Sequence, residues 1–305
     1  MTEYHVATDH LDPDTCEVTT TYLGTCTQER ADEVRAIALL PDTGRWVKDH
    51  PRQAGAFVVL RDDGDLDVFV PTDAPEFRID EPGPGADTGD PESMPRGAAG
   101  PAYISGAVKF GSQSIGGAMD HPESGPRITW HTTESPAGAS YFSSVALYLI
   151  RVASEPQVIY DPKTDRIGQF GPLNRSARAL RNDGGRRTNR EGKVNIQVEV
   201  LGRAASPWTK GFDASKKPNF RKVLAAGRAW GVPDSWPAGK PPAYPSGQSP
   251  RSRTVWQSKP GHYAHAQVPG NDHGDPGSID ISVVPGKAPA TPPVGSPAEV
   301  SRVRS

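Results

Sequence analysis

Residues 194–200, VNIQVEV, alternate apolar and polar side chains, which is the period-two spacing of a β-strand with two different faces. The segment RIGQF at residues 166–170 has the same spacing. Two further short strands are expected at RITWH, residues 127–131, and at QVIY, residues 157–160. These four segments predict a core sheet in the second half of the chain.

Two amphipathic helices are expected among these strands. Apolar residues recur at helical spacing over residues 141–153 and again over residues 218–230, where Gly231 is placed to end the second helix. Strands that alternate with helices predict an α/β domain, or more loosely an α+β domain, in which one mixed central β-sheet is covered by helices.

A separate, small α+β module is expected at the N-terminus. AFVVL at residues 56–60 and LDVFV at residues 66–70 flank the turn-prone Asp62-Asp63-Gly64, which predicts a β-hairpin. Upstream, the possible helix caps Thr25 and Thr27 precede apolar residues at helical spacing, namely Ala31, Val34, Ile37 and Leu40. The role of this module is not evident from its sequence.

Two segments rich in proline and small residues divide the chain. Residues 82–100 contain almost no large apolar side chain and are expected to form a linker. Residues 287–305 have a similar composition and are expected to form a flexible tail. The expected division is therefore a module at 1–81, the linker, a larger domain at 101–286 and the tail.

The composition excludes several classes of protein. The 305 residues include 34 Lys and Arg against 36 Asp and Glu, a formal charge of -2 that provides no general attraction for nucleic acid or anionic lipid. The first residues show no signal-peptide pattern, and no long apolar run indicates a membrane span. Only Cys16 and Cys26 occur, too few for a disulfide scaffold; they could pair across a short loop or remain free, and the free state is slightly favoured. The chain is expected to be soluble and monomeric.

Histidines and aspartates cluster near the end of the larger domain. This domain has five histidines, and three of them, His262, His265 and His273, fall within twelve residues that also contain Asp272. Three side chains drawn from His, Cys, Asp and Glu are what a catalytic zinc site needs. A solitary histidine at a strand end is, however, more often a core or surface residue, and Asp-Pro-Gly at 275–277 is more often a turn.

Two motifs resemble one enzyme family. RITWHTTE at 127–134 resembles the opening motif, and HAQVPGNDHGDPG at 265–277 the closing motif, of type 2 N-acetylmuramoyl-L-alanine amidases. This group includes peptidoglycan recognition proteins and many phage endolysins. Residues 161–170, 177–182 and 195–202 are similar to the middle section of the family. The resemblance covers about half of the chain and implies a zinc amidase domain.

The resemblance also implies the site residues. His131, His265 and Asp275 match the zinc ligands, and His262, which follows a glycine as in the family, is the rival for the second ligand. Two neutral imidazoles and one carboxylate leave Zn²⁺ a net positive charge that can activate water.

Two further residues match catalytic positions of the family. Glu199 matches the general base, which takes a proton from water and delivers it to the leaving nitrogen. His273 matches the side chain that stabilises the developing oxyanion. The alternatives are a solvated strand carboxylate for Glu199 and a loop histidine open to water for His273.

The chain departs from the family at two positions. Gln157 stands where many relatives have histidine, which puts substrate contacts in doubt, and Ala264 stands where they usually have glycine. Four aromatic residues are candidates for lining a glycan groove, although burial in the core is the alternative for most of them: Trp130, Tyr160, Trp208 and Trp256.

The expected function is therefore hydrolysis of peptidoglycan at the amide between N-acetylmuramic acid and L-alanine. The alternatives are a module that binds muropeptides without cutting them, and a zinc endopeptidase acting on the stem peptide. The missing signal favours a phage endolysin, which acts first in the host cytoplasm and then on the cell wall, with a cytoplasmic recycling amidase as the alternative. Peptidoglycan is the expected partner, with no nucleic acid and no membrane.

Overall fold

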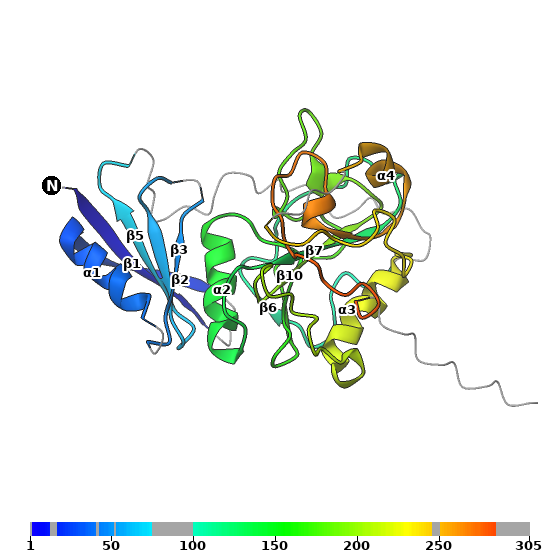
Figure 1. The fold of residues 1–305 in the computed structure, drawn as a ribbon. Helices are drawn as coiled ribbons and strands as arrows, with labels where there is room; N and C mark the ends of the chain where they lie inside the picture. Colours follow the sequence, from blue (N-terminus) through cyan, green and yellow to red (C-terminus); the bar gives the residue numbers. More distant parts are fainter. Residues whose placement is uncertain are drawn as a thin grey trace, which may run out of the picture.

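A computed structural model describes residues 2–12, 17–40, 43–51, 53–74, 100–245 and 251–284. They form two separate β-sheets with helices around them, as Figure 1 shows. This is a mixed α+β architecture, in agreement with the expected class. The expected linker, apart from Gly100, and the expected tail lie outside the described residues.

The N-terminal sheet has five antiparallel strands in the order β2-β1-β5-β4-β3. Its elements are β1 (Glu3–Leu11), β2 (Val18–Thr27), α1 (Gln28–Ala38), β3 (Trp46–Asp49), β4 (Phe57–Leu60) and β5 (Leu66–Pro71). The predicted hairpin is confirmed, because β4 pairs with β5 from Phe57 opposite Phe69 to Leu60 opposite Leu66. The strands β1, β2 and β3 were not predicted from the sequence.

Helix α1 begins as expected but buries a different stripe. Thr27 is its N-cap, since the Thr27 hydroxyl oxygen accepts a hydrogen bond from the Arg30 amide at 3.3 Å. Ala31 is buried, whereas Ile37 and Leu40 of the expected stripe are 41% and 57% exposed. Ala38 is buried instead. The small side chains of Ala31 and Ala38, two turns apart on the helix, face the sheet. On β2, Cys26 is free, and Cys16 lies outside the described residues.

The second sheet has six strands in the order β11-β7-β10-β8-β9-β6. Its elements are β6 (Val108–Lys109), β7 (Arg127–Thr132), α2 (Ala139–Arg151), β8 (Val158–Asp161), β9 (Arg166–Gln169), β10 (Asn195–Val200), α3 (Pro218–Ala229), α4 (Arg253–Ser258) and β11 (Gly261–Ala264). Pairings of β11, β7, β10 and β8 are parallel, and β8 pairs with β9 antiparallel. The four predicted strands are confirmed as members of one mixed sheet, and the two predicted helices are confirmed as α2 and α3. Strands β6 and β11 and helix α4 were not predicted.

The two faces of this sheet differ in polarity. Ile128, Trp130, Ile196 and Val198 belong to an apolar cluster with Phe220 of α3. The intervening residues of β7 and β10 point to the opposite face, because side chains alternate along a strand. That face is buried and polar, with Arg127, Thr129, His131, Asn195, Gln197 and Glu199.

Helix α2 lies between the two sheets (Figure 1), and it packs against β1, β4 and β5 on one side and β8 on the other. Its Phe142, Val145 and Leu149 share one apolar cluster with Leu60 and Val68 of the N-terminal sheet. The N-terminal sheet therefore covers a side of α2 that would otherwise be exposed, and the two parts share a core. Among the described residues, no helix has the length and apolarity needed to cross a membrane.

Candidate metal centre

Three neighbouring parallel strands deliver side chains to one point at their carboxyl ends. His131 lies on β7 and Glu199 on β10, and the two residues are register partners in the parallel pair. They share the polar face of the sheet. His265 directly follows β11, which pairs with the other edge of β7. The carboxyl ends of parallel strands are where open α/β sheets commonly bind ligands.

The structure brings together the three expected metal ligands, His131, His265 and Asp275, which are all buried and form a group that could hold a metal ion. The two Nδ1 atoms are 2.9 Å apart. Asp275 Oδ1 lies 3.1 Å from His265 Nδ1, and Asp275 Oδ2 lies 3.7 Å from His131 Nδ1. Ligand atoms around a tetrahedral zinc ion are about 3.3 Å apart, given bonds of about 2.0–2.1 Å. The spacing therefore fits a metal of this size.

Hydrogen bonds fix the orientation of one ligand, His265. His265 Nε2 donates to Asn271 Oδ1 at 2.9 Å, which leaves Nδ1 facing the other ligands. Asn271 is itself held, because its Oδ1 accepts from the Arg181 amide and its Nδ2 donates to the carbonyl oxygens of Arg181 and Pro269. Such outer partners select the histidine tautomer that can bind a metal.

The charges of the group are strongly coupled. Burial, with the neighbouring His265, lowers the pKa of His131 well below its ordinary value. Burial also acts to lower the pKa of His265, but the Asp275 carboxylate outweighs it and raises that pKa. Burial raises the pKa of Asp275, yet His265 and its hydrogen bond outweigh burial and hold it below the ordinary value. Asp275 is therefore the anionic member of the group.

Glu199 lies beside the group without belonging to it. Its Oε1 is 3.8 Å from His131 Nδ1. Burial, followed by the Asp275 carboxylate, raises the pKa of Glu199 to about 8. Its Oε2 is buried and has no hydrogen-bond partner among the described residues. The solvated strand carboxylate considered above is thus not what the structure contains, and Glu199 is placed to exchange a proton with a molecule at the metal centre.

His273 lies over the outer side of the group. Its ring stacks on that of His265, with centroids 4.7 Å apart and planes 8° apart, and its Nδ1 is 3.7 Å from Asp275 Oδ1. The side chain is 59% exposed, so it borders both the metal centre and the solvent. Burial and His265 lower the pKa of His273.

His262, the rival ligand, points elsewhere. Its Nδ1 accepts a hydrogen bond from Trp130 Nε1 at 3.0 Å, and its ring stacks against those of Trp130 and Trp236. Gln157 is structural as well, since its Nε2 donates to two carbonyl oxygens and its Oε1 accepts from the Gln197 amide. Neither residue reaches the metal centre.

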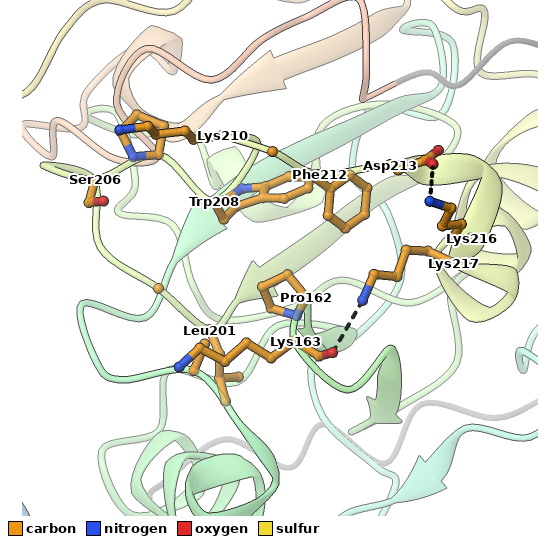
Figure 2. A pocket seen from close by; sticks show the side chains of 14 residues that line it. Pro162, Lys163, Leu201, Ser206, Trp208, Lys210, Phe212, Asp213, Lys216 and Lys217 are labelled. Atoms are coloured by element: carbon orange, nitrogen blue, oxygen red, sulfur yellow. Dashed lines mark hydrogen bonds and ion pairs between the residues drawn. The ribbon is translucent and has the colours of Figure 1, made fainter.

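A cavity of about 610 Å³ lies at the end of β10, and Figure 2 shows the side chains that line it. Leu201 and Gly202, which directly follow β10, line it, whereas the three ligand residues do not. Its walls carry one aspartate, Asp213, and four lysines: Lys163, Lys210, Lys216 and Lys217. Figure 2 shows Trp208 and Phe212 side by side on one wall, with ring centroids 5.0 Å apart. Of the four aromatic residues expected near a groove, only Trp208 lines this cavity; Trp130, Tyr160 and Trp256 are core residues.

Two residues near the centre had no predicted role. Asn271 lies inside the closing motif, so the motif itself was an available signal. Lys48 comes from the N-terminal sheet, and its Nζ donates to the Thr133 carbonyl oxygen across 85 positions of sequence. No local pattern indicates such a contact.

No protein-family model matches this chain, and no curated protein matches it in sequence. A functional assignment therefore rests on the two motifs and on the geometry of the centre.

Proposed function

We propose that this protein is a zinc-dependent N-acetylmuramoyl-L-alanine amidase, which hydrolyses the amide that joins N-acetylmuramic acid to L-alanine in peptidoglycan. The observation that carries the proposal is the register pair of His131 and Glu199, which sets a buried carboxylate next to a His, His and Asp group. Zinc bound by His131, His265 and Asp275 would supply a Lewis acid that activates water and polarises the scissile carbonyl.

The residues around the centre have separate tasks in this proposal. Glu199 accepts the proton of the attacking water and passes it to the leaving nitrogen of L-alanine. His273, exposed at the rim, donates a hydrogen bond to the oxygen on which negative charge develops. Asn271 keeps His265 in the tautomer whose Nδ1 is free to bind the metal.

The lysine-lined cavity is evidence for the proposed peptide substrate. Stem peptides of peptidoglycan carry free carboxylates, and four lysines against one aspartate provide cations to bind them. Trp208 and Phe212 add apolar surface on the same wall. In this proposal the scissile amide lies at the metal centre, and the peptide extends along the end of β10 into the cavity.

The proposal is tested by digesting purified peptidoglycan with and without a chelator and identifying the fragments by mass spectrometry. An amidase releases peptides that begin with L-alanine and leaves the glycan strands intact, and the chelator abolishes this release. An endopeptidase would leave alanine on the muramic acid. A zinc-loaded protein that binds peptidoglycan but releases nothing would instead be a recognition module.

Two isosteric variants separate base from ligand. Glu199→Gln should keep its zinc while kcat falls by a factor on the order of 10²–10⁴, the usual share of general base catalysis. Asp275→Asn should bind zinc weakly, because it removes the only anionic ligand, and added zinc should restore part of its activity. If Glu199→Gln were as active as the parent protein, another proton acceptor would be needed.

A further inference from the structure

The N-terminal sheet touches the rim of the metal centre through its edge strand β3. Trp46 and Lys48 are two positions apart and therefore share one face of β3. The Arg203 guanidinium lies 4.2 Å from the centroid of the Trp46 ring, and Arg203 follows β10 by three residues. The Lys48 Nζ donates to the Thr133 carbonyl oxygen, one residue beyond β7. This face of β3 thus contacts residues that follow β7 and β10, two of the three strands that form the centre.

The segment that Lys48 contacts holds Asp275 in place. The Thr132 amide donates to Asp275 Oδ2 at 3.2 Å. The Thr132 hydroxyl donates to Glu134 Oε1 at 2.7 Å, and the Ala204 amide donates to the same oxygen at 2.8 Å. Residues 132–134 are therefore a short brace between the metal ligand and the end of β10.

This brace is under backbone strain. Glu134 has φ of 50°, a left-handed conformation that residues other than glycine rarely adopt. A conformation of this kind persists only where surrounding contacts hold it. The bond from Lys48 to Thr133 lies on the peptide unit that directly precedes Glu134, so it fixes the chain at the entry to the strained residue.

Lys48 is also held in position from several sides. Its Nζ lies 4.8 Å from the centroid of the Tyr148 ring of α2, and the residue is half-buried. Burial lowers the pKa of Lys48, and three nearby carboxylates act against burial by favouring the charged ammonium group: Glu199, Glu134 and Asp275. The Lys48 ammonium group therefore interacts electrostatically with carboxylates of the metal centre, although Lys48 lies on the other sheet.

We propose that Lys48 is a positioning residue of the metal centre: through the Thr133 carbonyl it holds residues 132–134 in the conformation that presents the Asp275 carboxylate to the metal. The centre is then completed by the N-terminal sheet. This inference rests on the metal centre proposed above, but not on the identity of the substrate.

The test uses the full chain loaded with Co²⁺, whose visible absorption reports the geometry of its ligands. Lys48→Met keeps the aliphatic part of the side chain but removes the donor and the charge. We expect it to bind Co²⁺ about tenfold more weakly and to show altered absorption bands. This is the lower end of the cost of losing a direct outer partner of a ligand, because Lys48 acts on Asp275 through Thr133 and Thr132. Lys48→Arg, which keeps both donor and charge, should recover most of the affinity.

A matched control is Lys222→Met. Lys222 also donates to a backbone carbonyl oxygen, that of Ser105 at 3.1 Å, but it is exposed on α3 and outside the centre. It should match the parent protein in Co²⁺ affinity and spectrum. In peptidoglycan digestion, Lys48→Met should lower kcat about tenfold or more with little change in KM, because Lys48 acts through Asp275 and not on the substrate.

Parental Co²⁺ affinity and spectrum in Lys48→Met would overturn the proposal. If circular dichroism shows that Lys48→Met does not fold, the same Co²⁺ measurements are made on the milder variant Lys48→Gln. Parental Co²⁺ affinity and spectrum in that variant would likewise overturn the proposal. Loss of fold in both variants would make Lys48 a general structural residue and would also overturn the proposal. Absence of amidase activity in the parent protein would refute the proposed function alone, since the Co²⁺ measurements do not depend on it.

Discussion

Glu199 should make the stability of the metal-free protein depend on pH in a way that Glu199→Gln removes. The pKa of Glu199 rises from 4.5 in an unstructured chain to about 8 in the folded protein, chiefly because the side chain is buried. Between these pH values the folded state holds a proton that the unfolded chain has released. The stabilising contribution is complete below pH 4.5 and is lost as pH rises towards about 8.

The size of the effect follows from linkage. Each pH unit in this window changes the free energy of unfolding by about 1.4 kcal/mol per proton. Over the interval from 4.5 to about 8 the full effect is on the order of 5 kcal/mol, which is an upper bound for a group coupled to Asp275 and His265. Glutamine has no proton to lose. Glu199→Gln should therefore become progressively more stable than the parent protein as pH rises.

The assay is urea denaturation of both proteins in chelator at pH 5, 6, 7 and 8. The histidines and Asp275 are present in both proteins, so the difference in unfolding free energy isolates Glu199. Saturating zinc should shrink the difference, because a nearby dication favours the ionised carboxylate. Glu33→Gln, at an exposed ion pair with Arg30, serves as the control and should show no such trend. A difference that stays constant from pH 5 to 8 would refute the burial argument for Glu199.

Two further changes probe the surroundings of the centre, and a third probes the ion pair between α2 and β1. Asn271→Ala should weaken zinc binding about 10–100-fold in a competition titration, because His265 loses the acceptor that sets its tautomer. His273→Ala should keep its zinc by elemental analysis, while kcat on peptidoglycan falls by a factor on the order of 10²–10³. An unchanged kcat would show that His273 is a solvent-exposed loop residue without a catalytic role. Arg151→Met should lower the free energy of unfolding by about 3–5 kcal/mol in urea, because it leaves the buried Asp9 carboxylate without its cation. Arg30→Met, which breaks an exposed pair, should cost at most about 1 kcal/mol.

The larger domain was largely predictable because its sequence carries strong local signals. The alternation in β10 separates Ile196 and Val198, which face α3, from Gln197 and Glu199 on the polar face. Helices α2 and α3 carry wide apolar stripes. The site residues came from motif positions, and the structure places His131, His265 and Asp275 together.

The N-terminal sheet was harder to predict because its strands lack that contrast. Strand β2, VTTTYLGTCT, lies at the sheet edge and is mostly exposed, so it needs no apolar face. Strand β1 buries Tyr4, Ala7 and Asp9, a set with no clear hydrophobic period. The buried Asp9 carboxylate is compensated by Arg151 of α2, whose Nε donates to it at 2.8 Å, and by the Thr20 hydroxyl, which donates at 2.8 Å. Such a pairing depends on the folded chain and not on local sequence.

The Arg151–Asp9 pair joins α2 to the N-terminal sheet, so the N-terminal sheet and the larger domain do not form two independent parts. The polar face of the second sheet is buried, and α2, with the N-terminal sheet behind it (Figure 1), packs against β8 of the second sheet. Charges in such a dry layer interact more strongly than charges in water. That is why a proton on Glu199, a carboxylate on Asp275 and an ammonium group on Lys48 affect one another. Because the N-terminal sheet supplies both the cover of α2 and Lys48, we infer that it belongs to the same structural unit as the candidate metal centre and is not an independent attachment to it.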